Sequence, residues 1–316
     1  MSKDNITKYF VTGGAGFIGS HLVDQLVKIG QVTVYDNLSS GKPEFIEHHL
    51  GKSNFRFVKA DLLDFDALKQ IMNGHNIVFH LAANPDVRAG IRKTDLDLKQ
   101  GILATYNVLE AMRLNNVGKL IFTSSGTVYG EVTEPVVEDF IRLLPISLYG
   151  AGKLGSEGLI SAFCHLFNMQ GWIFRLANVI GAGSSHGVIF DFINKLRRNP
   201  EELEILGDGS QQKPYLHVDD CIDGMLFGLE HSKQQLNVFN LGTDSSTNVT
   251  AIARMVVKAM GLSGVTFSYT GGDRGWPGDV PQVRFDITKM RGLGWKPQYS
   301  SDRALSKAIN DICARE

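Results

Sequence analysis

The stretch Thr12-Gly-Gly-Ala-Gly-Phe-Ile-Gly19 decides the fold. It follows the apolar run 9–11 and precedes the periodic segment 21–27, so the sequence predicts a strand, a tight turn and a helix in immediate succession. Glycines at this spacing let the backbone turn sharply and let a pyrophosphate approach the amides at the helix N-terminus. Alone, such a turn is more often an ordinary connection, so the next strand has to be considered.

That next strand ends in an acid. Residues 31–36, Gln-Val-Thr-Val-Tyr-Asp, are rich in β-branched side chains, and Asp36 stands 17 residues after Gly19, where a carboxylate can bind the hydroxyls of an adenosine ribose. Together these features predict a dinucleotide site. A carboxylate repels a 2′-phosphate, and residues 37–40 contain no Arg to neutralise one, so the expected cofactor is NAD rather than NADP.

The composition excludes several classes of protein. The 316 residues, 43% hydrophobic and 21% charged, suit one large domain or two interleaved ones. A net charge of −1 without a dense basic run predicts no nucleic-acid or membrane partner. No apolar stretch approaches the ~18 residues of a membrane helix, so we expect a cytoplasmic protein. Cys164, Cys221 and Cys313 are far apart, suit a reducing compartment and predict no metal site.

Strand-like and helical segments alternate along the chain. The strand-like runs after residue 36 lie at 55–59, 76–80, 119–123 and 172–176, and the longest helical segments at 94–115 and 147–169. This alternation predicts an α/β fold with a Rossmann-type doubly wound parallel sheet. Beyond residue 177, glycine-rich turns separate shorter elements. We therefore expect an NAD-binding Rossmann domain at 1–177 and a smaller C-terminal α/β substrate-binding lobe at 178–316, interleaved with it.

The two long helical segments carry more apolar surface than one face can bury. In 94–115, apolar residues such as Leu98, Tyr106 and Met112 recur at helical spacing. They fit core packing or a homodimer interface equally well.

Tyr149 and Lys153 are one helical turn apart, on one face of the predicted helix 147–169. A tyrosine needs its pKa of about 10 lowered to act as a base near neutral pH, and a neighbouring cation does this. The pair is weak evidence alone, because this spacing is common on helices. Together with the dinucleotide turn it predicts a phenol that exchanges protons beside NAD.

These motifs resemble the extended short-chain dehydrogenase/reductase superfamily, and the resemblance covers essentially the whole chain. The segments that carry it are 12–21, 35–38, 60–62, 80–83, 123–130, 149–153 and 175–178. The most similar branch is the NDP-sugar 4-epimerases, of which UDP-glucose (UDP-galactose) 4-epimerase is the best known. The resemblance implies an NAD-dependent enzyme that acts on a nucleotide sugar, most simply a UDP-sugar.

The resemblance also implies roles for individual residues. The implied cofactor-binding residues are Gly13, Gly16, Phe17, Ile18, Gly19, Asp36, Asn37, Ser39, Ser40, Gly41, Asp61, Leu62, Leu81, Ala82, Ala83, Thr123, Tyr149, Lys153 and Ala177. Asp61 could instead cap the next helix. The implied catalytic residues are Ser125, Tyr149 and Lys153, and Ser124 is the alternative to Ser125 as the inward hydroxyl.

The implied substrate-binding residues are Ser125, Tyr149, Asn178, Lys213, Arg274 and Asp279. Asn178 could instead close a turn, and Asp279 could be a surface carboxylate. Lys213 and Trp276 stand where the family usually has arginines for the diphosphate, and lysine lacks the bidentate geometry of arginine. Arg274 is a nearby substitute. Arg88 is either a partner for an anionic sugar or a solvated charge.

The resemblance implies hydride removal and return at carbon 4 of the sugar. Related 4,6-dehydratases carry an Asp and a Glu where this chain has Gly126 and Thr127, so no second acid/base pair is expected. The prediction is an NAD-dependent 4-epimerase of the UDP-glucose/UDP-galactose type. Alternatives are an epimerase for UDP-N-acetylhexosamine or UDP-hexuronate, a ketoreductase, or a non-catalytic NAD sensor.

Overall fold

The structure is a computed structural model that describes residues 6–184 and 186–314. Its contacts divide the chain into two compact units. The first unit comprises Met1–Ser125, Leu148–Phe174 and Met225–Phe239, and the second comprises Gly126–Ser147, Arg175–Gly224 and Asn240–Glu316. The units are interleaved, because 126–147 belongs to the second unit and the chain returns to the first at 225–239.

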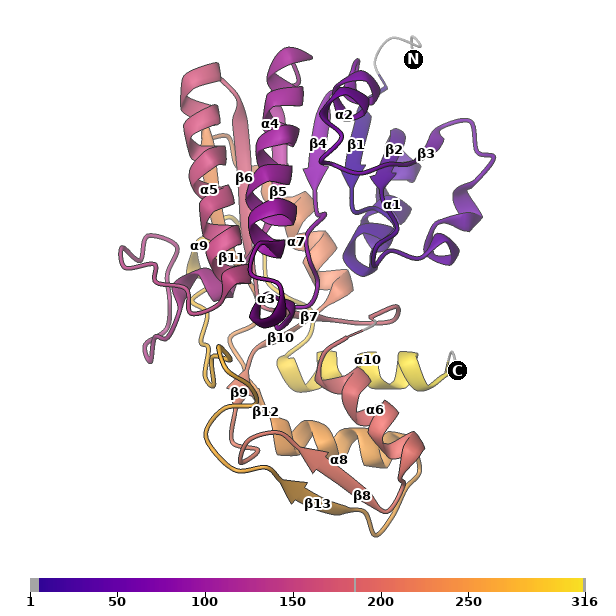
Figure 1. Ribbon diagram of the computed structural model, residues 1–316, viewed down its shortest axis with the longest axis vertical. Coiled ribbons are helices and arrows are strands. Elements are labelled where there is room, and N and C mark those ends of the chain that lie inside the picture. The colour runs from indigo at the N-terminus through magenta and orange to yellow at the C-terminus, as the bar shows by residue number, and fades with distance from the viewer. Residues whose placement is uncertain (1–5, 185, 315–316) are drawn as a thin grey trace. The chain divides into compact units, whose positions relative to one another are not determined.

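Seven strands form the main sheet (Figure 1). They are β1 (Lys8–Thr12), β2 (Gln31–Asp36), β3 (Phe55–Lys59), β4 (Ile77–His80), β5 (Lys119–Ser125), β6 (Gln170–Leu176) and β11 (Leu236–Leu241), in the order β11-β6-β5-β4-β1-β2-β3. β1 pairs in parallel with both β2 and β4, so the strand order reverses beside β1. Open α/β sheets bind ligands at this kind of reversal, outside the carboxyl ends of the strands.

Both faces of the sheet are covered. Phe10, Val78 and Phe122 pack in one core cluster with apolar residues of α2 (Phe65–Met72), α4 (Ala104–Leu114) and α5 (Leu148–Phe167). The neighbouring residues in the same strands, Val11, Phe79 and Ile121, point to the opposite face and are also fully buried. The first unit also contains α1 (Phe17–Ile29), α3 (Ala89–Arg92) and the part of α7 (Val218–His231) that begins at Met225. The predicted doubly wound sheet is therefore confirmed.

The predicted helix over 94–115 differs from the structure. A helix is present there, but its N-terminal part, η4 (Leu98–Leu103), is π-helical and continues without a break into α4 (Ala104–Leu114). Gly101 in this turn lies against Gly152 of α5, and a Cβ at 101 would stand 3.6 Å from the Gly152 Cα. That distance is an ordinary contact, whereas a Cβ at Gly152 would stand 3.0 Å from the Asp97 carbonyl oxygen. Gly152 thus allows a close approach of backbones that hydrophobic periodicity does not encode.

The second unit has its own α/β core. Its strand pairs are β7 (Asn178–Ile180) with β10 (Tyr215–His217), β8 (Glu202–Ile205) with β13 (Thr266–Tyr269), and β9 (Gln212–Lys213) with β12 (Thr247–Asn248). Its helices include α6 (Val188–Arg198), α8 (Val249–Ala259), α9 (Thr288–Gly292) and α10 (Ser301–Ala314). Residues such as Phe192, Ile252 and Leu305 bury the apolar faces of three of these helices in one cluster.

In the part of the chain that the structure describes, no helix is long and apolar enough to cross a membrane. Cys164 and Cys221 are free and buried, and Cys313 is free and half-buried. Burial raises the pKa of the Cys164 thiol to about 11, so this side chain packs as an apolar group rather than as a nucleophile.

Candidate active site

The glycine turn leaves no room for side chains. Gly13 has φ 70°, and a Cβ there would lie 2.7 Å from the Ala82 amide nitrogen. A Cβ at Gly19 would lie 2.1 Å from the Gly13 carbonyl oxygen. Gly16 precedes the first residue of α1 and offers no capping side chain. The bare backbone amides at the start of this helix fit the pyrophosphate of a dinucleotide.

Asp36 is fixed at the carboxyl end of β2. Its carboxylate accepts hydrogen bonds from the amides of Ala15, at 3.0 Å, and Leu38, at 2.8 Å. Burial raises the pKa of this carboxyl, and the two backbone hydrogen bonds oppose the change. A Cβ at Gly41 would stand 3.0 Å from both carboxylate oxygens, so a side chain at this position would crowd the acid. The arrangement suits the hydroxyls of an adenosine ribose.

Asp61 and Asn37 form a pair at the ends of neighbouring strands. The Asn37 Nδ2 donates to Asp61 Oδ2 at 2.9 Å, and the other Asp61 oxygen accepts from the Leu63 amide at 2.9 Å. The cap of α2 is Asp64, whose side chain accepts from the Ala67 amide. The alternative that Asp61 caps this helix is therefore wrong.

Most other predicted cofactor residues line the same sheet edge. Phe17 and Ile18 begin α1, Ser39 and Ser40 are exposed after β2, Leu62 is buried after β3, Leu81, Ala82 and Ala83 follow β4, and Thr123 lies in β5. The Leu81 amide donates to the Thr12 carbonyl at 3.2 Å, which ties the end of β4 to β1. Ala177 belongs to the second unit, where its amide donates to Leu241.

Lys153 is buried on α5. Its Nζ donates to the Thr123 carbonyl at 2.6 Å and lies 5.8 Å from the centre of the Tyr149 ring. Burial lowers the pKa of Lys153 to about 8, although the carboxylates of Glu157 and Asp97 act in the opposite direction. This ammonium is held at the end of β5, where a catalytic cation is expected.

Tyr149 is one turn earlier on the same helix and hydrogen bonds with Ser125. Burial raises the pKa of the phenol to about 12, which the Ser125 hydrogen bond only partly offsets. The expected lowering by Lys153 is not seen in the chain alone, because the ammonium bonds to Thr123 rather than to the phenol. The phenol is therefore protonated until further positive charge reaches it.

The two serines at the end of β5 form hydrogen bonds with different side chains. Ser124 is buried and its hydroxyl donates to Glu157 Oε1 at 2.5 Å. Ser125 bonds with Tyr149. The structure thus joins Ser125, and not Ser124, to the predicted phenol.

A buried network that the sequence analysis missed supports these residues. His80 Nδ1 lies 2.8 Å from the Thr12 hydroxyl, and its Nε2 lies 3.0 Å from the Thr105 hydroxyl. Thr105 in turn donates to Ser156 at 3.1 Å. Burial lowers the pKa of His80 to about 3, so the ring is neutral and joins β1, β4, α4 and α5. The sequence signal that could have indicated this network is a polar residue, His80, at the end of a buried strand.

The predicted substrate-binding charges cluster in the second unit. Lys213 forms an ion pair with Asp279, whose second oxygen accepts from the Gly275 amide at 3.2 Å. Arg274 donates to the Asp279 carbonyl at 3.3 Å and pairs with Glu131 at 2.5 Å. Asp279 is 5% exposed, so the alternative of a surface carboxylate is wrong.

Two further alternatives can be compared with the structure. Asn178 begins β7 and pairs with Tyr215 of β10, so it does not close a turn. The Arg88 side chain is 61% exposed and lies 3.6 Å from Asp86, as expected for a solvated charge.

Gly126, at the start of η5 (Gly126–Tyr129), has no space for a side chain. A Cβ at this position would stand 2.5 Å from the Phe285 ring. The site therefore lacks the acid that a dehydratase carries here, and an acid could enter only if Phe285 moved.

Comparison with known proteins gives the family. A model of the NAD dependent epimerase/dehydratase family matches residues 9–242. The chain belongs to this family. It is 32% identical to a UDP-glucose 4-epimerase of Mycolicibacterium smegmatis, with 95% of this chain and 96% of the relative aligned. The predicted extended short-chain dehydrogenase/reductase resemblance is thereby confirmed.

Solved structures of the family have the same fold. A UDP-galactose 4-epimerase is 36% identical and superposes with a TM-score of 0.88 over 98% of this chain and 99% of that one. A Bacillus cereus UDP-glucuronic acid 4-epimerase in complex with UDP-glucuronic acid and NAD is 30% identical, with a TM-score of 0.89 over 98% and 100% of the two chains. The family is NAD-dependent, which confirms the predicted cofactor.

Replacing Asp36 by Ala should lower the preference for NAD over NADP about tenfold or more. The variant loses hydrogen bonds to a charged group, each contributing about 1.5–3 kcal/mol, and no longer repels a 2′-phosphate. Calorimetric titration with both dinucleotides measures the preference, and Asp66→Ala, an exposed acid on α2, is the control. An unchanged preference in Asp36→Ala would mean that the ribose contact is assigned to the wrong residue.

Lys153 should make stability depend on pH. Its pKa is about 8 in the folded chain and about 10.5 when unfolded, so the unfolded state binds more protons between these values and stability rises with pH. The unfolding free energy of the wild type minus that of Lys153→Met should increase from pH 8 to pH 10 in denaturant titrations. A difference that stays flat or falls would show that the buried ammonium is not destabilised.

Proposed function

We propose that this chain is an NAD-dependent nucleotide-sugar 4-epimerase of the UDP-glucose/UDP-galactose type. The observation that carries the proposal is the Ser125–Tyr149 hydrogen bond beside the buried Lys153. These groups stand at the end of β5 on the same unit as the glycine turn and Asp36. These groups can remove and return one hydroxyl proton, which is the only proton transfer that epimerisation at carbon 4 requires.

NAD, when bound, accepts a hydride from carbon 4, returns it, and contributes positive charge near the phenol. Tyr149 takes the proton of the 4-hydroxyl, with Ser125 sharing the hydrogen bond. Lys153 stabilises the phenolate electrostatically and is held in place by the Thr123 carbonyl. After the 4-keto sugar has turned, Tyr149 returns the proton. The phenol regains its starting state, so no outside acid or base is consumed.

The same residues argue against a dehydratase. Eliminating water across two carbons needs a second acid and base beside the sugar. Gly126 supplies no side chain, and Phe285 occupies the space that one would fill. Thr127 in the next position has a hydroxyl, which cannot replace a carboxylic acid near neutral pH. Epimerisation at a single carbon is therefore favoured within the family.

The nucleotide is proposed from the charge cluster of the second unit. Lys213 and Arg274 would bind the diphosphate with Asn178, and Asp279 would accept hydrogen bonds from the ribose. Lys213 and Asp279 pair with each other in the chain alone, so a diphosphate would have to draw Lys213 from that partner. The relatives that act on UDP-sugars support uridine diphosphate as the carrier.

We also propose a homodimer built on α4 and α5. Tyr106, Phe163 and Phe167 form a line of ring contacts across these helices. Tyr106 and Phe167 are 43% and 44% exposed, and Leu166 beside them is 74% exposed. A second copy would cover these apolar side chains. The buried Met112 shows that part of the predicted apolar face belongs to the core instead.

Tyr149→Phe tests the proposed function. The variant should lose about 10²- to 10⁴-fold of the interconversion of UDP-glucose and UDP-galactose, because general acid–base catalysis is removed. Its NAD content should remain that of the wild type, since the cofactor cradle is unchanged. The control is Tyr269→Phe, an exposed phenol in the second unit. Retained turnover in Tyr149→Phe would contradict the assignment of the proton carrier.

A further inference from the structure

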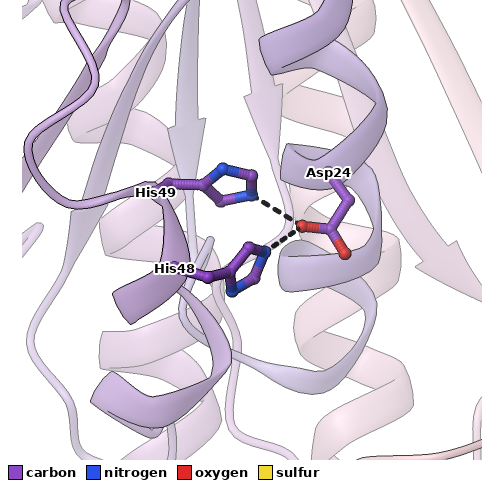
Figure 2. Close-up of side chains that lie close together, drawn as sticks. All are labelled: Asp24, His48 and His49. Atoms are coloured by element: carbon purple, nitrogen blue, oxygen red, sulfur yellow. Dashed lines mark hydrogen bonds and ion pairs between the residues drawn. The ribbon is translucent and has the colours of Figure 1, made fainter.

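Two imidazoles and a carboxylate meet on the first unit, among residues that the proposed reaction does not use (Figure 2). Asp24 comes from α1, and His48 and His49 come from η3 (Glu47–His49), in the connection from β2 to β3. The Nε2 atoms of His48 and His49 lie 2.8 Å and 2.6 Å from the same oxygen, Asp24 Oδ1. Both rings therefore direct their Nε2 atoms to the same carboxylate oxygen.

The three potential ligand atoms lie within 4.8 Å of one another. A tetrahedral zinc ion with bonds of about 2.0–2.2 Å holds its ligand atoms about 3.3 Å apart. The two nitrogen–oxygen distances would thus open by only about 0.6 Å for the ion to replace the ring protons. His49 is anchored, with a side chain 5% exposed, whereas His48 and Asp24 are 51% and 40% exposed and can adjust.

We propose that Asp24, His48 and His49 form a zinc site. Two imidazole nitrogens and one carboxylate oxygen are donors that zinc favours, whereas magnesium and calcium prefer oxygen alone. Three protein ligands leave a fourth position for water, which the exposure of His48 and Asp24 permits. The sequence analysis predicted no metal, because it considered the cysteines and not the adjacent histidines.

One neighbour opposes the ion. Lys52 Nζ lies 2.9 Å from His49 Nδ1, so in the chain alone this nitrogen accepts the hydrogen bond. A neutral imidazole that ligates through Nε2 carries its proton on Nδ1, so Lys52 would have to move aside. Lys52 is exposed and has a flexible side chain, which makes this movement possible.

The location gives the site a structural role. The Lys42 amide donates to the Ala15 carbonyl at 2.9 Å, so one hydrogen bond already joins the connection after β2 to the glycine turn. The ion would replace the hydrogen bonds that join η3 to α1 with coordination bonds between the same residues. A ligand that binds the folded state and not the unfolded state raises the stability of the protein. The site is therefore proposed as a clamp on the segment that follows the ribose-binding acid.

The test is titration of the cofactor-containing protein with zinc chloride, by calorimetry and by competition with a chromophoric chelator. The wild type should bind one equivalent, and His48→Gln and Asp24→Asn should each weaken binding at least about tenfold, since even the loss of an outer partner costs 10- to 100-fold. His48→Gln is decisive because this exposed ring is least needed for folding. Zinc should raise the melting temperature of the wild type but not of this variant.

Two controls separate the cluster from other groups. His165→Gln removes an exposed histidine on α5 whose Nδ1 lies 2.8 Å from the Ser161 carbonyl oxygen of the same helix, and should bind zinc as the wild type does. Lys52→Met keeps all three ligands and removes the opposing ammonium, so it should bind at least as tightly. Equal losses in His48→Gln and His165→Gln, no binding by the wild type, or weaker binding by Lys52→Met would each overturn the site.

Discussion

The close approach of Gly13 and Gly19 is the constraint on which the first unit depends. The Gly13 carbonyl stands where a side chain at 19 would begin, so α1 can start directly after β1 only because both residues are bare. The same turn places the Ala15 amide against Asp36. One backbone geometry thus creates both the anion-binding helix end and the orientation of the ribose-binding acid. Any side chain at Gly19 would disturb both functions together.

The chemistry at the end of β5 depends on burial. Burial disfavours charge on both Tyr149 and Lys153, raising the pKa of the phenol and lowering that of the ammonium. The chain alone therefore holds a protonated phenol beside a weakened cation. The positive charge of bound NAD would favour the phenolate form of Tyr149. We therefore expect Tyr149 to take the sugar's hydroxyl proton only when NAD is in place to take the hydride. This coupling suits a reaction that must leave the cofactor unchanged after each cycle.

Local sequence signals predicted the parts of the fold that are themselves local. The glycine turn, Asp36 and the first six strands follow from residue spacing, because strand period and turn chemistry act over a few residues. The seventh strand of the main sheet, β11, was missed because it is defined by pairing with β6, far away in sequence. The His80 network and the Asp24–His48–His49 cluster were missed for the same reason. The dimer, the cytoplasmic location and the sugar remain predictions.

The most direct test of the account is epimerisation in heavy water. UDP-galactose would be incubated in D₂O with the purified protein and no added cofactor, and the products followed by proton NMR. If hydride leaves and returns at carbon 4 while Tyr149 carries only the hydroxyl proton, UDP-glucose should form with ordinary hydrogen at carbon 4. Deuterium at carbon 4 or carbon 5 of the product, or no UDP-glucose at all, would contradict the proposed reaction.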